Sequence, residues 1–155
     1  MKVLQSLYAF FQSGSEDLAT GEKELFFGID KILDLYLYQF SLLSELHYQA
    51  GRQIEENKQK KLPSRGDLYP NTRFVENSCL RLIARHPGLQ ELYKRRGTQW
   101  STEAELVRRL LHHIQQQHYY REYMAESDGG FAADRDFVLR MIKKDIMHFE
   151  MLHQF

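Results

Sequence analysis

The sequence predicts an all-α protein, a single helical bundle of about six to seven helices around one long central helix. Apolar residues recur at steps of three and four along most of the chain, which is the spacing of one helix face. No segment has the alternating pattern of a β-strand, and no internal repeat is evident. The chain has 155 residues, enough for one core, so we expect a single all-helical domain over residues 1–155.

The first helix is expected over residues 2–14, with Gly14 at its end. A longer second helix begins near Thr20, the expected N-cap, and reaches Lys58. Gly28 interrupts this second helix at a cost of about 1 kcal/mol relative to alanine. We therefore expect Gly28 to let the first helix approach closely.

One side of the second helix is apolar over its whole length. The stripe consists of Leu25, Ile29, Ile32, Tyr36, Phe40, Leu43, His47, Ala50 and Ile54. Between Leu33 and Leu46 the opposite side is apolar as well. A helix that is apolar all round needs cover on both sides, so we expect this helix to be the central pillar of the domain.

Proline, glycine and capping residues divide the middle of the chain into shorter helices. A loop over residues 60–71 follows the pillar, and Asn71 is expected to cap a helix that ends before Pro87. Pro87 begins a short helix that ends at Gly97, because proline suits the first helical turn and glycine the position after the last.

Two further helices are expected after Gly97. Thr102 and Glu105 match a capping box that opens the first of them, and a loop at residues 128–130 separates it from a last helix that begins near Asp134. The final turns carry Phe149, Met151, Leu152 and Phe155. Because this apolar end has no stop signal, we expect the chain to be part of a longer protein, and a homodimer to form through the last helix.

The charge of the chain is balanced overall but unevenly distributed. Lys and Arg number 21, as do Asp and Glu, so no global field attracts a nucleic acid or a membrane. Residues 58–109 nevertheless hold twelve Lys and Arg against five Asp and Glu, and the flanks hold nine against sixteen. This basic middle either contacts an anionic partner or is a solvated face.

Motifs for catalysis or metal binding are weak. Asp145-x-x-His148 and Glu150-x-x-His153 have the spacing of di-iron bundles, but on one helix they point about 140° apart. No phosphate-binding loop or serine nucleophile motif is present, and Cys79 has no histidine at a useful helical spacing. We therefore expect no metal, no cofactor and no enzymatic activity.

The expected location is the cytoplasm, without membrane association. The single cysteine, Cys79, excludes an intramolecular disulfide framework and suits a reducing compartment. The longest uncharged apolar stretch, residues 35–44, is about half of a membrane span. The start of the chain does not have the pattern of a signal peptide.

Cations beside aromatic rings are typical of proteins that bind single-stranded RNA, where charge pairs with phosphate and bases stack on rings. The candidate cations are Lys58, Lys60, Lys61, Arg81, Arg85, Lys94, Arg95 and Arg96. Tyr69, Tyr93 and Trp100 lie near them in the sequence and are expected to be exposed for stacking. Cations at helix ends also complement the helix dipole, so the pattern alone leaves both interpretations open.

Two segments near the start of the chain carry recognisable motifs. Residues 3–8 read Val-Leu-Gln-Ser-Leu-Tyr and are followed by Gly14, and residues 24–29 read Glu-Leu-Phe-Phe-Gly-Ile. These resemble the Gln-x-Leu-Tyr core and the Glu-Leu-x-x-Gly-Val motif of the NusB family of bacterial transcription antitermination factors. The resemblance extends over residues 2–14 and 22–40.

The resemblance implies an all-helical RNA-binding factor that regulates transcription termination. Such a factor recognises a boxA-like RNA and pairs with ribosomal protein NusE in the RNA polymerase antitermination complex. The family's RNA contacts on the first helix correspond here to Lys2, Gln5 and Tyr8. The family's arginine run and closing helices have no match in the sequence, so the resemblance implies the N-terminal part of a long, lineage-extended NusB-like protein.

The alternative interpretation is a helical protein–protein interaction scaffold without nucleic-acid binding. In that case the basic middle contacts an acidic protein surface, and the apolar last helix mediates assembly.

Overall fold

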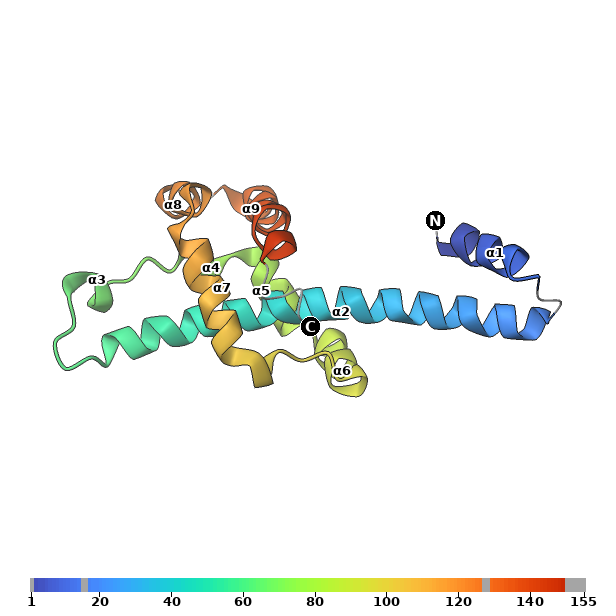
Figure 1. The fold of residues 1–155 in the computed structure, drawn as a ribbon. Coiled ribbons are helices and arrows are strands. Elements are labelled where there is room, and N and C mark those ends of the chain that lie inside the picture. The colour runs from blue at the N-terminus through green and yellow to red at the C-terminus, as the bar shows by residue number, and fades with distance from the viewer. Residues whose placement is uncertain (1, 15–16, 127–128, 150–155) are drawn as a thin grey trace.

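The computed structural model describes residues 2–14, 17–126 and 129–149, and these residues form helices and connections without a β-strand. The predicted all-α class is therefore confirmed. The long helix α2 (Leu18–Lys58) crosses the molecule, and α1 (Lys2–Gln12) lies alone beside its N-terminal half (Figure 1). The other helices gather around its C-terminal half.

More and shorter helices follow α2 than the sequence predicted. They are α3 (Arg65–Leu68), α4 (Arg73–Glu76), α5 (Ser78–Arg85), α6 (Pro87–Arg96), η1 (Ser101–Glu103), α7 (Ala104–Gln116), α8 (His118–Ala125), α9 (Gly130–Lys144) and η2 (Ile146–His148). The helix expected from Asn71 to Pro87 breaks at Asn77, whose side chain accepts a hydrogen bond from the Leu80 amide and caps α5. The helix expected after Gly97 breaks at Gln117, which has extended backbone angles.

Several predicted helix starts are wrong. The N-cap of α4 is Thr72 rather than Asn71, and α9 begins at Gly130 rather than near Asp134. The N-cap of α2 is Asp17, because its Oδ1 accepts hydrogen bonds from the amides of Ala19 and Thr20 at 3.1 and 3.2 Å. The capping box at Thr102 does not form, since the 3₁₀ turn η1 occupies that position and α7 begins at Ala104. In contrast, Pro87 and Gly97 bound α6 as predicted.

The middle of α2 is the pillar that the sequence predicted. Leu37, Leu42 and Leu43 point to different sides of the helix, about 100–140° apart at 100° per residue, and each is at most 3% exposed. α5 and α7 both pack on this part of α2. The predicted burial of the whole apolar stripe is wrong for the N-terminal half, where Ile29 and Tyr36 are exposed because α1 and the end of α6 pack on other sides of the helix.

The close approach between α1 and α2 occurs at Gly21 rather than at Gly28. A Cβ atom at Gly21 would lie 2.7 Å from the Phe10 ring, whereas a Cβ at Gly28 would meet nothing within 4 Å. The expectation for Gly28 is therefore wrong. Phe10 lies on Gly21 and Leu7 lies near Leu25, so the two helices form an antiparallel hairpin.

The core lies between the C-terminal half of α2 and helices α5, α7, α8 and α9. Phe137 of α9 is at its centre: the ring stacks on Tyr123 with centroids 3.9 Å apart and meets Phe74 edge-on at 6.0 Å. Val138 and Met141 of α9 are buried beside it. The inner face of the last helix is thus used by the core, and Met151, Leu152 and Phe155 lie outside the described residues.

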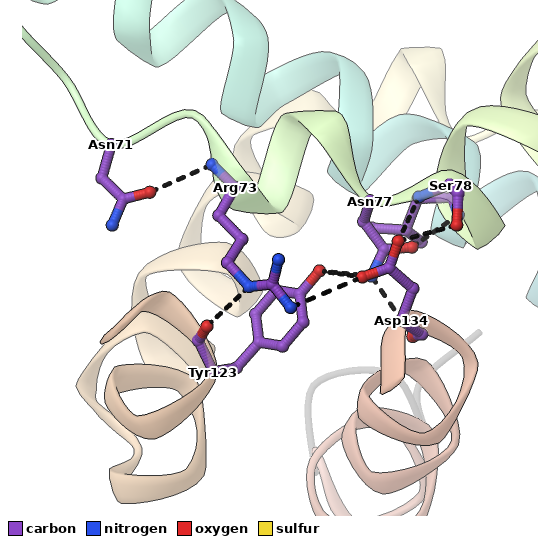
Figure 2. A network of polar contacts seen from close by, with 7 residues as sticks. Asn71, Arg73, Asn77, Ser78, Tyr123 and Asp134 are labelled. Carbon is purple, nitrogen blue, oxygen red and sulfur yellow. Dashed lines mark hydrogen bonds and ion pairs between the residues drawn. The ribbon is translucent and has the colours of Figure 1, made fainter. Parts of the chain in front are cut away.

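A buried polar network joins α4, α5, α8 and α9 around Asp134 (Figure 2). One carboxylate oxygen of Asp134 accepts hydrogen bonds from the Ser78 amide and hydroxyl, both at 2.7 Å, and the other accepts one from the Tyr123 hydroxyl at 2.7 Å. Asn77 Nδ2 donates to the Tyr123 hydroxyl at 2.9 Å. The Arg73 guanidinium lies over the Tyr123 ring, and its Nε donates to the Tyr123 carbonyl at 2.8 Å.

The network keeps Asp134 ionised. Burial raises the pKa of Asp134, but the hydrogen bonds from Ser78 and Tyr123 and the charge of Arg73 outweigh it and hold the pKa below its ordinary value. Burial raises the pKa of Tyr123, and its hydrogen bond to Asp134 raises it further, so the tyrosine stays the donor.

Replacing Asp134 with alanine is expected to lower the free energy of unfolding by about 3–5 kcal/mol, because the donors and the cation around it lose their acceptor. Asp136→Ala, on the exposed side of the same helix, is expected to change stability by less than about 0.5 kcal/mol. Urea denaturation followed by circular dichroism measures both. Equal effects of the two substitutions would contradict the structural role of the network.

Gly28→Ala is expected to stabilise the hairpin by about 0.5–1 kcal/mol through helix propensity. Gly21→Ala is expected to gain less, because the Phe10 ring has to move. Amide hydrogen exchange in α1 and α2 measures the difference. Equal protection in the two variants would show that α1 does not pack closely on Gly21.

Candidate nucleic-acid interface

The candidate RNA-binding residues lie at four separate places along α2 (Figure 1). Lys2, Gln5 and Tyr8 are on α1; Lys58, Lys60 and Lys61 are at the end of α2; Arg81 and Arg85 are on α5; Lys94, Arg95 and Arg96 are on α6. Since α2 rises 1.5 Å per residue, Lys58 lies about 55 Å along the helix from Gly21, where α1 packs. The first two groups therefore cannot share one small site.

On α1, Gln5 and Tyr8 are exposed, and the Tyr8 hydroxyl accepts a hydrogen bond from Gln12 at 3.1 Å. The side chain of Lys2 lies outside the described residues. The hairpin that carries these residues is acidic, with Asp17 at the N-cap of α2 and Glu22 and Glu24 in its first two turns. Tyr8 is thus available for stacking, but the nearby charge does not attract phosphate.

The lysines after α2 are partly used inside the protein. Lys58 pairs with Glu55 at 3.0 Å, and Lys60 pairs with Asp67 at 3.3 Å. Both are surface pairs that water screens and that compete weakly with a phosphate. Lys61 is exposed and has no ion-pair partner among the described residues.

Arg96 is the most strongly engaged of the candidate cations. Its guanidinium donates to both carboxylate oxygens of Asp30, at 3.0 and 3.2 Å, and to Asp34 at 3.3 Å. Hydrogen bonding from Arg96 and its charge hold the pKa of Asp30 below the ordinary value. Arg96 therefore fastens the end of α6 to α2, while its neighbours Lys94 and Arg95 are exposed and have no ion-pair partner within the described ranges.

Arg81 and Arg85 lie one turn apart on α5 and are both exposed. Together with His86 and Pro87 they line a shallow hollow of about 450 Å³. Arg85 also faces a larger groove of about 800 Å³ between α2, α6 and the segment before α7, which we call the α2–α6 groove. Of the cations predicted to bind RNA, Arg81 and Arg85 are thus the two that line hollows on the surface.

The α2–α6 groove contains residues that the sequence analysis missed. Tyr48 and Arg52 of α2 line it together with Gln90 and Gln99. Tyr48 is exposed, and Arg52 pairs with Glu56 at 2.5 Å. Arg52 lies before the basic segment counted from the sequence, and only the packing of α5 and α6 against α2 brings it to the same groove as Arg85.

His47, in the floor of the groove, is neutral at physiological pH. Its Nε2 donates to the Val75 carbonyl at 2.8 Å. Burial lowers the pKa of His47, and the charges of Arg85 and Arg81 lower it further. The charged side chains that line the groove are therefore Arg52 and Arg85, together with Glu45, while His47 is neutral.

Two of the three rings expected to be exposed are buried. Tyr93 is 2% and Trp100 is 9% exposed, and Trp100 donates its indole N–H to the Tyr38 carbonyl at 2.9 Å. Only Tyr69 is open to solvent as expected. The prediction was wrong for Tyr93 and Trp100 because both rings anchor the α6–α7 connection to α2.

The described residues hold no group of three or more metal-ligating side chains, and Glu150 and His153 lie outside them. Cys79 is half-buried against the core, and burial raises the pKa of its thiol, which suits a packing role more than a nucleophile. Among the described helices, none combines the length and the hydropathy needed to cross a membrane.

In comparisons with known proteins, no family model matches the chain, and no curated protein or solved structure shows significant similarity to it.

Arg96→Ala is expected to loosen the end of α6 and to speed amide exchange around Gly97, whereas Arg95→Ala is expected to leave the exchange rate there unchanged.

Because the pKa of Asp30 is depressed in the folded protein, the ion pair between Asp30 and Arg96 stabilises the fold above the ordinary Asp pKa of about 4. This contribution is lost as the pH falls through the folded pKa. The stability difference between wild type and Arg96→Ala is therefore expected to shrink below about pH 4; a constant difference would contradict the ion pair.

Proposed function

We propose that this chain is an RNA-binding part of a NusB-type transcription antitermination factor that acts with ribosomal protein NusE on a boxA-like RNA. The observation that carries the proposal is the pairing of α1 with the beginning of α2. These two helices contain both segments that resemble the family, residues 2–14 and 22–40. Their contact as a hairpin supports the proposal.

In this proposal, the RNA phosphates bind to the exposed cations that have no ion-pair partner among the described residues. Lys61, Arg81, Arg85, Lys94 and Arg95 are exposed and lack an ion-pair partner in the described part of the chain. Arg81 and Arg85 stand out because they border concave surface, where an exposed ring, Tyr48, is also available for a base. We expect phosphates to bind these arginines and a base to stack on Tyr48.

A factor of this kind works beside RNA polymerase in the cytoplasm, so we assign this chain to the cytoplasm as part of the same proposal. It needs no bound cofactor and no catalytic group, because recognition of RNA by charge, stacking and hydrogen bonds is an equilibrium process. NusE and the RNA polymerase antitermination complex are its proposed partners.

A protein-interaction scaffold without nucleic-acid binding is the second candidate. It is favoured by the large apolar side chains that α1 and the first half of α2 leave in solvent, among them Leu4, Phe11 and Phe26. Apolar surface of this extent marks a contact with another protein surface.

Binding of a labelled boxA-like RNA, with and without NusE, tests the first candidate against the second. We expect binding that weakens steeply with salt, since each phosphate contact with a single strand contributes about 0.7 to the slope of log K against log[salt]. Arg81→Ala/Arg85→Ala is expected to lower both the affinity and this slope, the slope by about 1.4.

Arg135→Ala/Arg140→Ala is the matched control, because it removes two exposed arginines from α9, away from both hollows. It is expected to change the slope by much less. If NusE is present and no RNA binds at low salt, the scaffold is the better interpretation. Equal losses in the two double variants would contradict a site at Arg81 and Arg85.

A further inference from the structure

The hairpin of α1 and the first turns of α2 extends beyond the other helices, of which α6 contacts α2 from Asp30 onward (Figure 1). One side of this hairpin and of α2 up to Phe40 is exposed. We define the arm face as the exposed apolar residues on that side. They are Leu4, Tyr8 and Phe11 of α1, and Phe26, Ile29, Leu33, Tyr36 and Phe40 of α2. This face is distinct from the arginine-lined groove and does not depend on RNA binding.

The arm face has the spacing of a helix–helix seam. On α2 its members, from Phe26 to Phe40, follow one another at steps of three, four, three and four, which is the heptad pattern of paired helices. On α1 its members are at steps of four and three. Neither stripe is the surface that holds the hairpin together, since that contact uses Phe10 on Gly21.

Both stripes point to the same side of the hairpin. Each helix of the hairpin has two surfaces: the one that packs on the other helix, and the exposed apolar stripe. At 100° per residue, the centre of the stripe is rotated by about 90–100° from the centre of the packing surface, in the direction of increasing residue number. Because the two helices are antiparallel, the same sense of rotation along each chain brings both stripes to one side. The arm face is therefore one continuous two-helix surface.

The net negative charge of the arm disfavours an anionic occupant such as RNA or an acidic membrane, so the RNA surface proposed above is the one at Arg81 and Arg85 and not this face. From Leu18 to Asp34, α2 carries two lysines, Lys23 and Lys31. The acidic residues in the same stretch are four: Glu22, Glu24, Asp30 and Asp34. None of these charges belongs to the arm face. Glu22 lies one turn before Phe26, at the tip, and Asp30 lies one turn after Phe26, where it is paired with Arg96 of α6. A copy of the same face can thus approach without like charges in the middle of the contact.

The geometry points to a second copy of this chain as the occupant, with two hairpins closing a four-helix bundle across a twofold axis. A twofold contact needs a self-complementary surface, and an uncharged apolar face meets this requirement. At about 200 Å² per aromatic side chain, the exposed parts of the five rings alone offer roughly 600 Å² per copy. This is close to the ~800 Å² that each partner contributes to a standard interface.

The test is the mass of the purified chain in solution, measured by sedimentation equilibrium over a range of concentrations. We expect a dimer, at twice the chain mass of 18.5 kDa. Phe26→Lys/Leu33→Lys is expected to raise the dissociation constant at least about 100-fold, because it places charge in the centre of the face in both copies.

Phe27→Lys/Leu35→Lys is the matched control. Both residues are on the same helix and more than half exposed, but they point away from the arm face, so the dimer is expected to persist. Leu139→Lys, on exposed α9 surface, is expected to leave the dimer intact and tests association through the last helix. Circular dichroism checks that all variants stay helical.

A wild-type chain that stays monomeric at every concentration would overturn the proposal. So would a dimer that the arm variant leaves intact, or one that the control pair weakens equally. None of these results bears on RNA binding by Arg81 and Arg85, so the two proposals fail or stand separately.

Discussion

The rest of the structure depends on the middle of α2, which is apolar on every side and cannot be covered by one partner helix. Leu37, Leu42 and Leu43 lie about 100–140° apart around the helix and need packing on separate faces. Helices α5 and α7 supply part of this packing. Two hydrogen bonds hold the connection between α6 and α7 on the same stretch of α2: Trp100 donates to the Tyr38 carbonyl, and Ser41 donates to the Thr98 carbonyl. Several shorter helices are therefore needed to cover the middle of α2, and this requirement determines how they are arranged around it.

Polar contacts then decide how the outer helices are oriented. Helices α8 and α9 are joined twice, since Tyr123 donates to Asp134 near one end of α9 and Tyr119 donates to Asp145 near the other, with Phe137 packed between the tyrosines. Buried carboxylates are costly without partners, so only one relative position of these helices satisfies both. Apolar packing alone would allow several.

The same arrangement separates two surfaces of different chemistry. The arginines of α5 border hollows beside the pillar, where charge and an exposed ring are available to a polyanion. The hairpin at the other end of α2 exposes large apolar side chains along its open side and suits an apolar partner. One long helix therefore connects a basic surface and an apolar surface, and Arg96, paired with Asp30, fixes α6 at the point where the two regions meet.

The sequence by itself determined the all-α class, the extent of α2 to within a few residues, and the α6 boundaries at Pro87 and Gly97, because these follow from periodicity and local backbone preferences. Only the tertiary structure decided that Ile29 and Tyr36 are exposed, that Gly21 rather than Gly28 contacts the first helix, and that Trp100 is buried. An apolar stripe is the same in the sequence whether or not a partner covers it, and a cation is the same whether it faces Asp30 or solvent. These outcomes depend on which helices meet, and local sequence does not carry that information.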